Sequence, residues 1–196
     1  MIKWKRKAFR GVGLLFPATL YGFGRYGAAV TLAVLTLFLA ILVSLEISRF
    51  RYPGVNRWLF RHFQDYTKDK ERARVSATTL YLSACWLVVL LFPAPIAVAA
   101  MTFLLVGDPA AELVGTRWGR VPLLGKSLEG TLAGLLACTA AGFLLLLLPG
   151  LALDAKTVLG GAAAATCMEL APVPVDDNFT VPLFSATVMH LVWVFL

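Results

Sequence analysis

The sequence is short of charged residues, histidines and cysteines. Only 15% of its 196 residues are charged, whereas a soluble domain of this length has about a quarter. The chain therefore lacks the polar residues needed to cover a water-exposed surface, which excludes an ordinary soluble fold. Its two histidines and three cysteines show no metal-ligand spacing and no paired pattern. Neither a zinc site nor a disulfide framework is indicated.

Apolar residues, by contrast, make up 59% of the chain and are gathered in runs. A membrane-spanning helix needs roughly 17–25 predominantly apolar residues, and several runs approach or reach that length. We therefore expect an all-α polytopic membrane protein with about seven membrane helices, forming one domain over residues 1–196. The expected segments are Val12–Phe23, Tyr26–Leu45, Ser76–Phe92, Ile96–Val106, Leu128–Leu148, Thr157–Leu170 and Val181–Leu196.

The basic residues lie between these segments with a strong bias. If the N-terminus is cytoplasmic, the inside connections are residues 1–11, 46–75, 107–127 and 171–180. The first three contain five, eight and three Lys or Arg residues, which is sixteen of the eighteen in the chain. The positive-inside rule therefore predicts a cytoplasmic N-terminus, in the inner membrane if the protein is bacterial. Since topology and anionic head groups account for the net charge of +7, nucleic-acid binding is not predicted.

The connection 46–75 is expected to be a basic cytoplasmic loop. Its segment Val55–Tyr66 alternates aromatic with basic residues. This pattern fits an amphipathic helix lying in the membrane interface, and it fits an ordinary polar loop equally well.

Six acidic residues from three separate stretches of the sequence fall at or near the same, cytoplasmic, membrane surface in this topology. Acids at the end of an apolar span are costly unless they pair, bind a metal or meet water. Because Lys126 and Arg117 accompany them, a site for Mg²⁺ and phosphate groups is indicated. The six acids are Asp108, Glu112, Glu129, Glu169, Asp176 and Asp177.

The segment from Gly107 to Gly130 combines glycines, acids and a lysine. Asp108 and Glu112 are four residues apart and share one face if this segment is helical. Glycine allows a ligand to approach the backbone closely, and a Lys with a hydroxyl at a helix start can bind phosphate together with backbone amides. A P-loop is not indicated, because Arg120 stands where that motif requires glycine.

A second acidic group consists of Glu169 and the run Asp176-Asp177-Asn178. Adjacent carboxylates repel one another unless a proton or a cation lies between them, which favours a divalent metal. The alternative is a solvated acidic turn in which Asn178 caps the last helix. The first acidic group on the same membrane face favours the metal.

These residues resemble those of the CTP-dependent lipid-alcohol kinases, namely dolichol kinase, phytol kinase and the CTP-using diacylglycerol kinase. That family is in turn similar to the phosphatidate cytidylyltransferases. Two blocks carry the resemblance, Gly107-Asp108-x-x-Ala111 through Lys126-Ser127-x-Glu129-Gly130, and Asp176-Asp177-Asn178-x-Thr180-x-Pro182. A weaker third block consists of Arg6-Lys7, Glu46 and Arg49. The family often has a histidine after the first basic pair, where this chain has Arg10.

The resemblance implies Mg²⁺-dependent transfer, or transfer with another divalent cation, of the γ-phosphoryl group of CTP to the hydroxyl of a membrane lipid. The acceptor would be a polyprenol or dolichol, a diacylglycerol or phytol. The implied catalytic residues are Asp108, Glu112, Lys126 and Asp177, with Asp108 or Glu112 accepting the hydroxyl proton. The implied metal ligands are Asp108, Asp177, Asp176 and Glu169. The implied nucleotide and phosphate ligands are Gly107, Gly115, Arg117, Gly119, Gly125, Ser127, Glu129, Gly130 and Asn178. Arg6, Lys7, Glu46 and Arg49 are possible substrate-positioning residues.

Two other functions stay open at this point. A cytidylyltransferase would use similar metal and phosphate chemistry to make a CDP-lipid. A small transporter or channel would need acids spread through the depth of the membrane, and the acids here gather at one surface.

Overall fold

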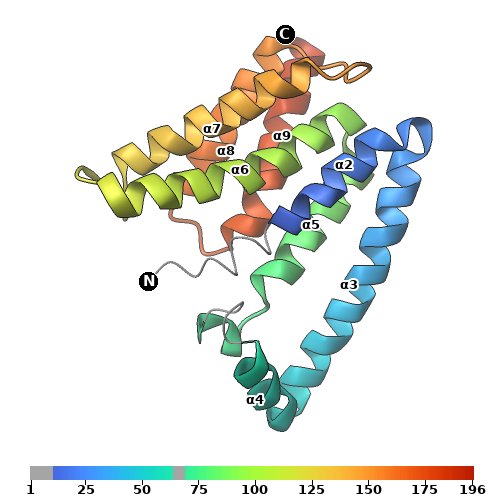
Figure 1. Ribbon diagram of the computed structural model, residues 1–196, viewed down its shortest axis with the longest axis vertical. Helices are drawn as coiled ribbons and strands as arrows, with labels where there is room; N and C mark the ends of the chain where they lie inside the picture. Colours follow the sequence, from blue (N-terminus) through green and yellow to red (C-terminus); the bar gives the residue numbers. More distant parts are fainter. Residues whose placement is uncertain (1–10, 64–68) are drawn as a thin grey trace.

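The computed structural model describes residues 11–63 and 69–196, and most of them are in helices (Figure 1). Four helical stretches in these residues are long and apolar enough to cross a membrane, and two shorter apolar helices accompany them. The predicted all-α polytopic fold is therefore confirmed. The long stretches are Gly24–Arg51, Ala94–Trp118, Leu128–Leu146 and Asp177–Phe195, and the shorter ones are Val12–Gly22 and Ala77–Leu91.

The helices are joined by short connections and one small hairpin. In chain order the α-helices are α2 (Leu15–Gly22), α3 (Gly27–Arg51), α4 (Pro53–His62), α5 (Ala77–Leu91), α6 (Ala94–Trp118), α7 (Leu128–Leu146), α8 (Ala155–Leu170) and α9 (Asp177–Phe195). Short 3-10 turns cover Val12–Leu14, Gly24–Tyr26 and Asp69–Ala73. The antiparallel strands β1 (Pro122–Leu123) and β2 (Lys126–Ser127) link α6 to α7.

The helices are unevenly packed. Figure 1 shows α6, α7, α8 and α9 gathered together, while α3 runs along the edge with α2 and α5 between it and α6. Helix α6 supplies a large part of the core, with the whole run Ile96–Met101 buried. Only Gly27, Thr31, Leu35 and Arg49 are buried in α3. Most of the α3 surface is thus left for contact with lipid.

Helix α6 is longer than the sequence predicts. The expected segment Ile96–Val106 and the first part of the expected polar loop form one continuous helix to Trp118, with Pro109 inside it. Proline removes one helical hydrogen bond, but neighbouring packing lets membrane helices tolerate it. The prediction of a loop after Val106 was wrong, and as a result Asp108 and Glu112 lie on the same helix.

Small residues let α6 and α7 pack very closely. A Cβ atom added at Gly130 would lie 2.8 Å from the backbone oxygen of Ala111, and one at Gly107 would lie 2.6 Å from Cys138 Sγ. A Cβ atom on Gly115 would approach Ser127 Oγ to 2.9 Å. Close backbone contact through small residues is a common way for helices to associate in lipid. It also brings the acids of α6 next to the start of α7.

Two further helix boundaries differ from the prediction, and each difference places polar residues on a helix. Helix α3 runs six residues past Leu45, so it carries Glu46 and Arg49. Helix α9 begins at Asp177 rather than Val181, with Asp176 as its N-cap.

A helix also forms over Pro53–His62, which overlaps the predicted Val55–Tyr66 segment. The last residues of that segment lie outside the described chain. Its position in the membrane interface stays a prediction.

Candidate active site

A polar cavity of about 510 Å³ lies where α6, the hairpin, α7, α8 and α9 meet. The continuity of α6 explains the lining on one side, because residues at helical spacing along it face the same way. All four residues predicted to be catalytic line the cavity. The lining residues are Asp108, Ala111, Glu112, Gly115, Thr116, Gly125, Lys126, Ser127, Gly130, Thr131, Glu169 and Asp177.

The hairpin between α6 and α7 positions Lys126. Its two turn residues, Leu124 and Gly125, have φ angles of +47° and +84°. Positive φ at both central residues defines the tight turn that matches the twist of two antiparallel strands, and glycine adopts it without strain. The carboxylate of Glu129 accepts hydrogen bonds from the Val121 amide at 3.2 and 3.3 Å. The turn and this contact hold the lysine-bearing strand against the start of α7.

The ammonium group of Lys126 lies between two carboxylates from other helices. Its Nζ atom is 3.3 Å from Glu169 Oε1 and 3.4 Å from Asp177 Oδ2, and it also donates to the Glu169 backbone carbonyl. The Glu169 side chain is 12% exposed, whereas those of Lys126 and Asp177 are each 38% exposed. Lys126 therefore joins the ends of α8 and α9 and still faces the cavity.

The first turn of α7 adds the positive end of a helix beside Lys126. Ser127 is the N-cap of α7, and its Oγ accepts a hydrogen bond from the Gly130 amide at 3.2 Å. The Leu128 amide donates to the Val121 carbonyl at 2.9 Å, so both of these amides already have acceptors. The helix end still carries partial positive charge, which favours an anion such as phosphate. Because Ser127 and Gly130 both line the cavity, a phosphate there would meet the helix end and the lysine together.

The cavity is rich in negative charge. Four carboxylates (Asp108, Glu112, Glu169 and Asp177) line it with a single ammonium group, that of Lys126. In residues 11–63 and 69–196, no group of three His, Cys, Asp or Glu side chains is close enough to bind a metal ion by itself. Mg²⁺ is often held by only one or two carboxylates, with substrate phosphates and water completing its shell. The lining therefore fits a cation that arrives with a polyphosphate, but not a preformed metal cage.

Several predicted ligands lie outside the lining of this cavity. The carboxylate of Asp176 caps α9, accepting from the Asn178 amide at 3.2 Å. The Glu129 carboxylate is turned to Val121, and the exposed Arg117 guanidinium lies 5.9 Å from the Trp118 ring centroid. Gly107 and Gly119 are sites of close packing. Their metal or nucleotide roles stay predictions, and the geometry gives Asp176, Glu129 and the two glycines a structural role.

Two lining residues were missed by sequence reasoning. Thr116 and Thr131 border the cavity, and both donate to backbone carbonyls four residues earlier, Thr116 to Glu112 and Thr131 to Ser127. Each follows a predicted site residue by four positions on a helix. That spacing would have identified Thr131 on the predicted helix that starts at Leu128, and Thr116 once α6 was recognised as continuous.

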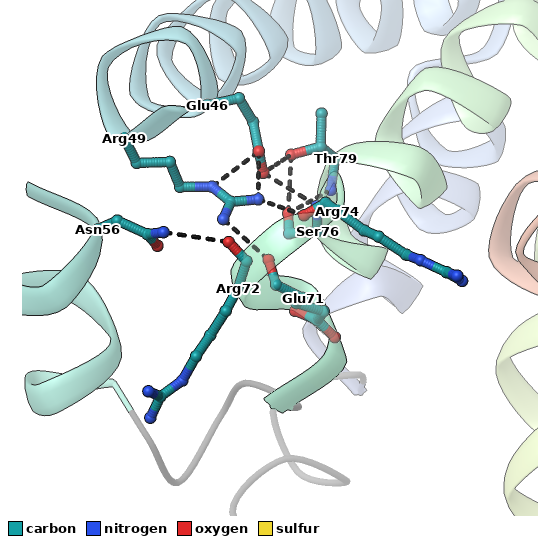
Figure 2. Close-up of polar contacts among 8 residues, drawn as sticks. All are labelled: Glu46, Arg49, Asn56, Glu71, Arg72, Arg74, Ser76 and Thr79. Carbon is teal, nitrogen blue, oxygen red and sulfur yellow. Dashed lines mark hydrogen bonds and ion pairs between the residues drawn. The ribbon is translucent and has the colours of Figure 1, made fainter. Parts of the chain in front are cut away.

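Glu46 and Arg49 form a polar cluster that is separate from the cavity (Figure 2). The Arg49 guanidinium donates to Glu46 Oε2 at 2.8 Å and to the carbonyls of Glu71 and Arg74 at 2.8 and 2.5 Å. Glu46 Oε1 accepts from the Ser76 amide at 3.0 Å. The cluster ties the end of α3 to the segment that leads into α5. Neither residue lines the polar cavity, so their substrate-positioning role stays a prediction, while Arg6 and Lys7 lie outside the described residues.

We expect Arg49→Met to destabilise the fold without changing the affinity for substrate. Arg49 is 5% exposed and Glu46 12%, so the substitution leaves a nearly buried carboxylate without its cation. Such a loss costs about 3 kcal/mol, which thermal unfolding in detergent would detect. Arg51→Met, on the exposed end of the same helix, is the matched control and should have little effect. A raised KM for the lipid at unchanged stability would contradict this and favour substrate positioning.

Comparison with known proteins gives one functional clue. Over 201 aligned positions the chain is 26% identical to CTP-dependent diacylglycerol kinase 1 of Schizosaccharomyces pombe (strain 972), which covers 95% of this chain and 92% of that protein. It is 23% identical over 184 positions to an uncharacterised protein of Rickettsia prowazekii (strain Madrid E), covering 91% and 89%. No family model and no solved structure matches. From end to end, the chain is therefore similar to a CTP-dependent lipid kinase.

Proposed function

We propose that this protein transfers the γ-phosphoryl group of CTP to the hydroxyl of a membrane lipid alcohol. One observation carries the proposal most directly: Lys126 and the first turn of α7 face the same cavity as four carboxylates. Phosphoryl transfer requires mainly positioning and neutralisation of charge, and this cavity offers both. The similarity to a CTP-dependent diacylglycerol kinase supports CTP as the donor and diacylglycerol as the first acceptor to test, with polyprenols and phytol next.

In the proposed reaction the acceptor oxygen forms a bond to the γ-phosphorus of CTP. The bond from that phosphorus to the β–γ bridging oxygen breaks, and CDP leaves with the electron pair. The hydroxyl proton passes to a carboxylate of α6. Lys126 and the positive end of α7 offset the negative charge on the phosphoryl oxygens.

Glu169 and Asp177 are the carboxylates best placed to hold a divalent cation, because both already contact the cation of Lys126. A divalent cation held by these residues would supply positive charge that offsets the negative charge of the phosphate groups. The Lys126 ammonium group attracts both carboxylates and offsets the repulsion between them. This arrangement supports binding of the metal together with CTP rather than before it.

The topology supports a cytoplasmic position for the cavity. Most of its lining residues lie in the stretches 107–127 and 171–180, which the distribution of Lys and Arg places inside, and CTP is a cytoplasmic nucleotide. We propose an integral membrane enzyme whose polar cavity opens to the cytoplasm, where donor and acceptor meet at the membrane surface.

The test is transfer of label by the purified full-length protein in lipid nanodiscs with Mg²⁺. CTP labelled in the γ-phosphate should label diacylglycerol, phytol or a polyprenol, whereas CTP labelled in the α-phosphate should leave the lipid unlabelled. Label from the α-phosphate in the lipid would instead show a cytidylyltransferase. Ion flux in liposomes without nucleotide turnover would show a transporter and overturn the proposal.

A further inference from the structure

A second cavity, almost wholly apolar, adjoins the polar one. It measures about 590 Å³, which lies within the range of roughly 300–1,000 Å³ typical of small-molecule sites. Its walls come mainly from α2, α3, α5 and α6. The lining residues are Val12, Gly13, Leu15, Phe16, Thr19, Val34, Phe38, Ile41, Leu42, Ala77, Thr78, Tyr81, Leu82, Leu104, Leu105, Asp108 and Asn178.

Asp108 lines both cavities. Along α6, Leu104 and Leu105 face the apolar cavity, while Ala111, Glu112 and Gly115 face the polar one. These positions follow one another at helical spacing, so a single stripe of α6 passes from one cavity to the other. Asp108 stands at the crossing point, and it is the only charged residue among the described residues that line the apolar cavity.

The apolar cavity borders the part of the molecule that faces lipid. Among its lining residues, Phe38 and Ile41 of α3 are 49% and 50% exposed, and Leu15 of α2 is 60% exposed. Figure 1 shows α3 at the edge of the molecule, with α2 and α5 between it and α6. These exposed lining residues place the apolar cavity beside the lipid-facing surface, where the hydrocarbon chains of the bilayer lie.

We propose that the apolar cavity is the acceptor site, which holds the hydrocarbon chain of the lipid alcohol and directs its hydroxyl to Asp108. This inference rests on the proposed kinase function and assigns the proton acceptor, because Glu112 borders only the polar cavity. A nucleotide does not fit the apolar cavity, since its triphosphate would meet apolar walls and one acid. A molecule with a long apolar chain and a single terminal hydroxyl matches both parts of the lining.

The first test narrows the cavity. Val34→Trp fills it from α3, and Leu37→Trp is the matched control, because Leu37 is on the same helix, 62% exposed and not part of the lining. For a long-chain diacylglycerol, we expect Val34→Trp to lower kcat/KM by about tenfold or more, a typical cost of misfit in an apolar pocket. The KM for CTP and the turnover of dioctanoylglycerol should stay close to wild type, and Leu37→Trp should change neither acceptor.

The second test does not need catalysis. A diacylglycerol with a diazirine midway along one chain is photolysed with the wild-type protein in nanodiscs, and the adducts are mapped by mass spectrometry. We expect adducts on cavity residues of α2, α3 and α5, with dioleoylglycerol competing and dioleoylphosphatidylcholine, which has no free hydroxyl, not competing. Adducts spread over the outer faces of α7 to α9, or equal competition by the phosphatidylcholine, would overturn the acceptor site.

The two tests separate the two proposals. If the wild-type protein transfers no phosphate to any lipid but the probe still labels the cavity, the acceptor site stands and the kinase function fails. If transfer occurs but Val34→Trp affects long and short acceptors equally, the kinase function stands and the acceptor site fails. If Val34→Trp does not fold, the labelling of the wild-type protein decides.

Discussion

Asp108→Asn is expected to reduce lipid phosphorylation by a factor on the order of 10²–10⁴, the usual contribution of a positioned general base. The substitution keeps the shape of the side chain but removes its ability to accept a proton from the acceptor hydroxyl. Because Asp108 lies where the two cavities meet, both KM values should change little and kcat should carry the loss. The measurement is the initial rate of γ-label transfer from CTP to diacylglycerol.

Asp154→Asn provides the matched control for this experiment. Asp154 caps the start of α8 and accepts the Thr157 amide at 2.8 Å, and asparagine caps a helix about as well as aspartate. It lies one helix length from Glu169, roughly 22 Å at 1.5 Å per residue. We expect near-normal activity from this variant. Near-normal turnover in a well-folded Asp108→Asn protein would show that the proton acceptor has been wrongly assigned.

Lys126→Ala is expected to lower kcat by a factor on the order of 10²–10³, as loss of a single preorganised donor to a developing charge does elsewhere. The KM for CTP should rise as well, since the lysine also neutralises ground-state phosphate. The variant leaves Glu169 and Asp177 without their shared cation, and neighbouring carboxylates disfavour each other's charge. Nucleotide binding and turnover would be measured on the same purified sample.

Two controls separate chemistry from folding in the Lys126 experiment. Lys126→Arg keeps the positive charge, so it should retain CTP binding better than Lys126→Ala while losing part of kcat, because the guanidinium is larger than the ammonium. Thermal unfolding of each variant reports the loss of the contacts with α8 and α9. If Lys126→Ala binds and turns over CTP normally at wild-type stability, the polar cavity is not the nucleotide site.

Hydropathy predicted the fold class correctly but misplaced the ends of helices. The apolar signal of the fourth segment fades at Gly107-Asp108-Pro109, and proline usually marks a helix boundary. In the structure the helix continues through Pro109 because α6 packs closely on α7 over this stretch. Packing between segments distant in sequence is not contained in a local pattern, so the extra turns of α6 were not predictable from it.

The candidate site, like the helix ends, was predictable only in part. Topology correctly indicated that Asp108, Lys126, Glu169 and Asp177 would meet, since their segments end at one membrane face. It did not distinguish a capping acid such as Asp176 from an acid facing the cavity, because both stand beside a helix start. The apolar cavity was not predictable at all. An unfilled space between four helices appears only when their side chains are placed in three dimensions.

The close contact between α6 and α7 also bears on how the sequence can diverge. A Cβ atom at Gly107, Gly115 or Gly130 would meet backbone or side-chain atoms of the opposite helix or its N-cap. The lipid-facing surface of α3, in contrast, can exchange one apolar residue for another at little cost. Distant relatives should therefore keep small residues at these three positions even where overall identity has fallen to the level seen here. A search that requires small residues at these positions, rather than identical ones, would help to find homologues that pairwise comparison overlooks.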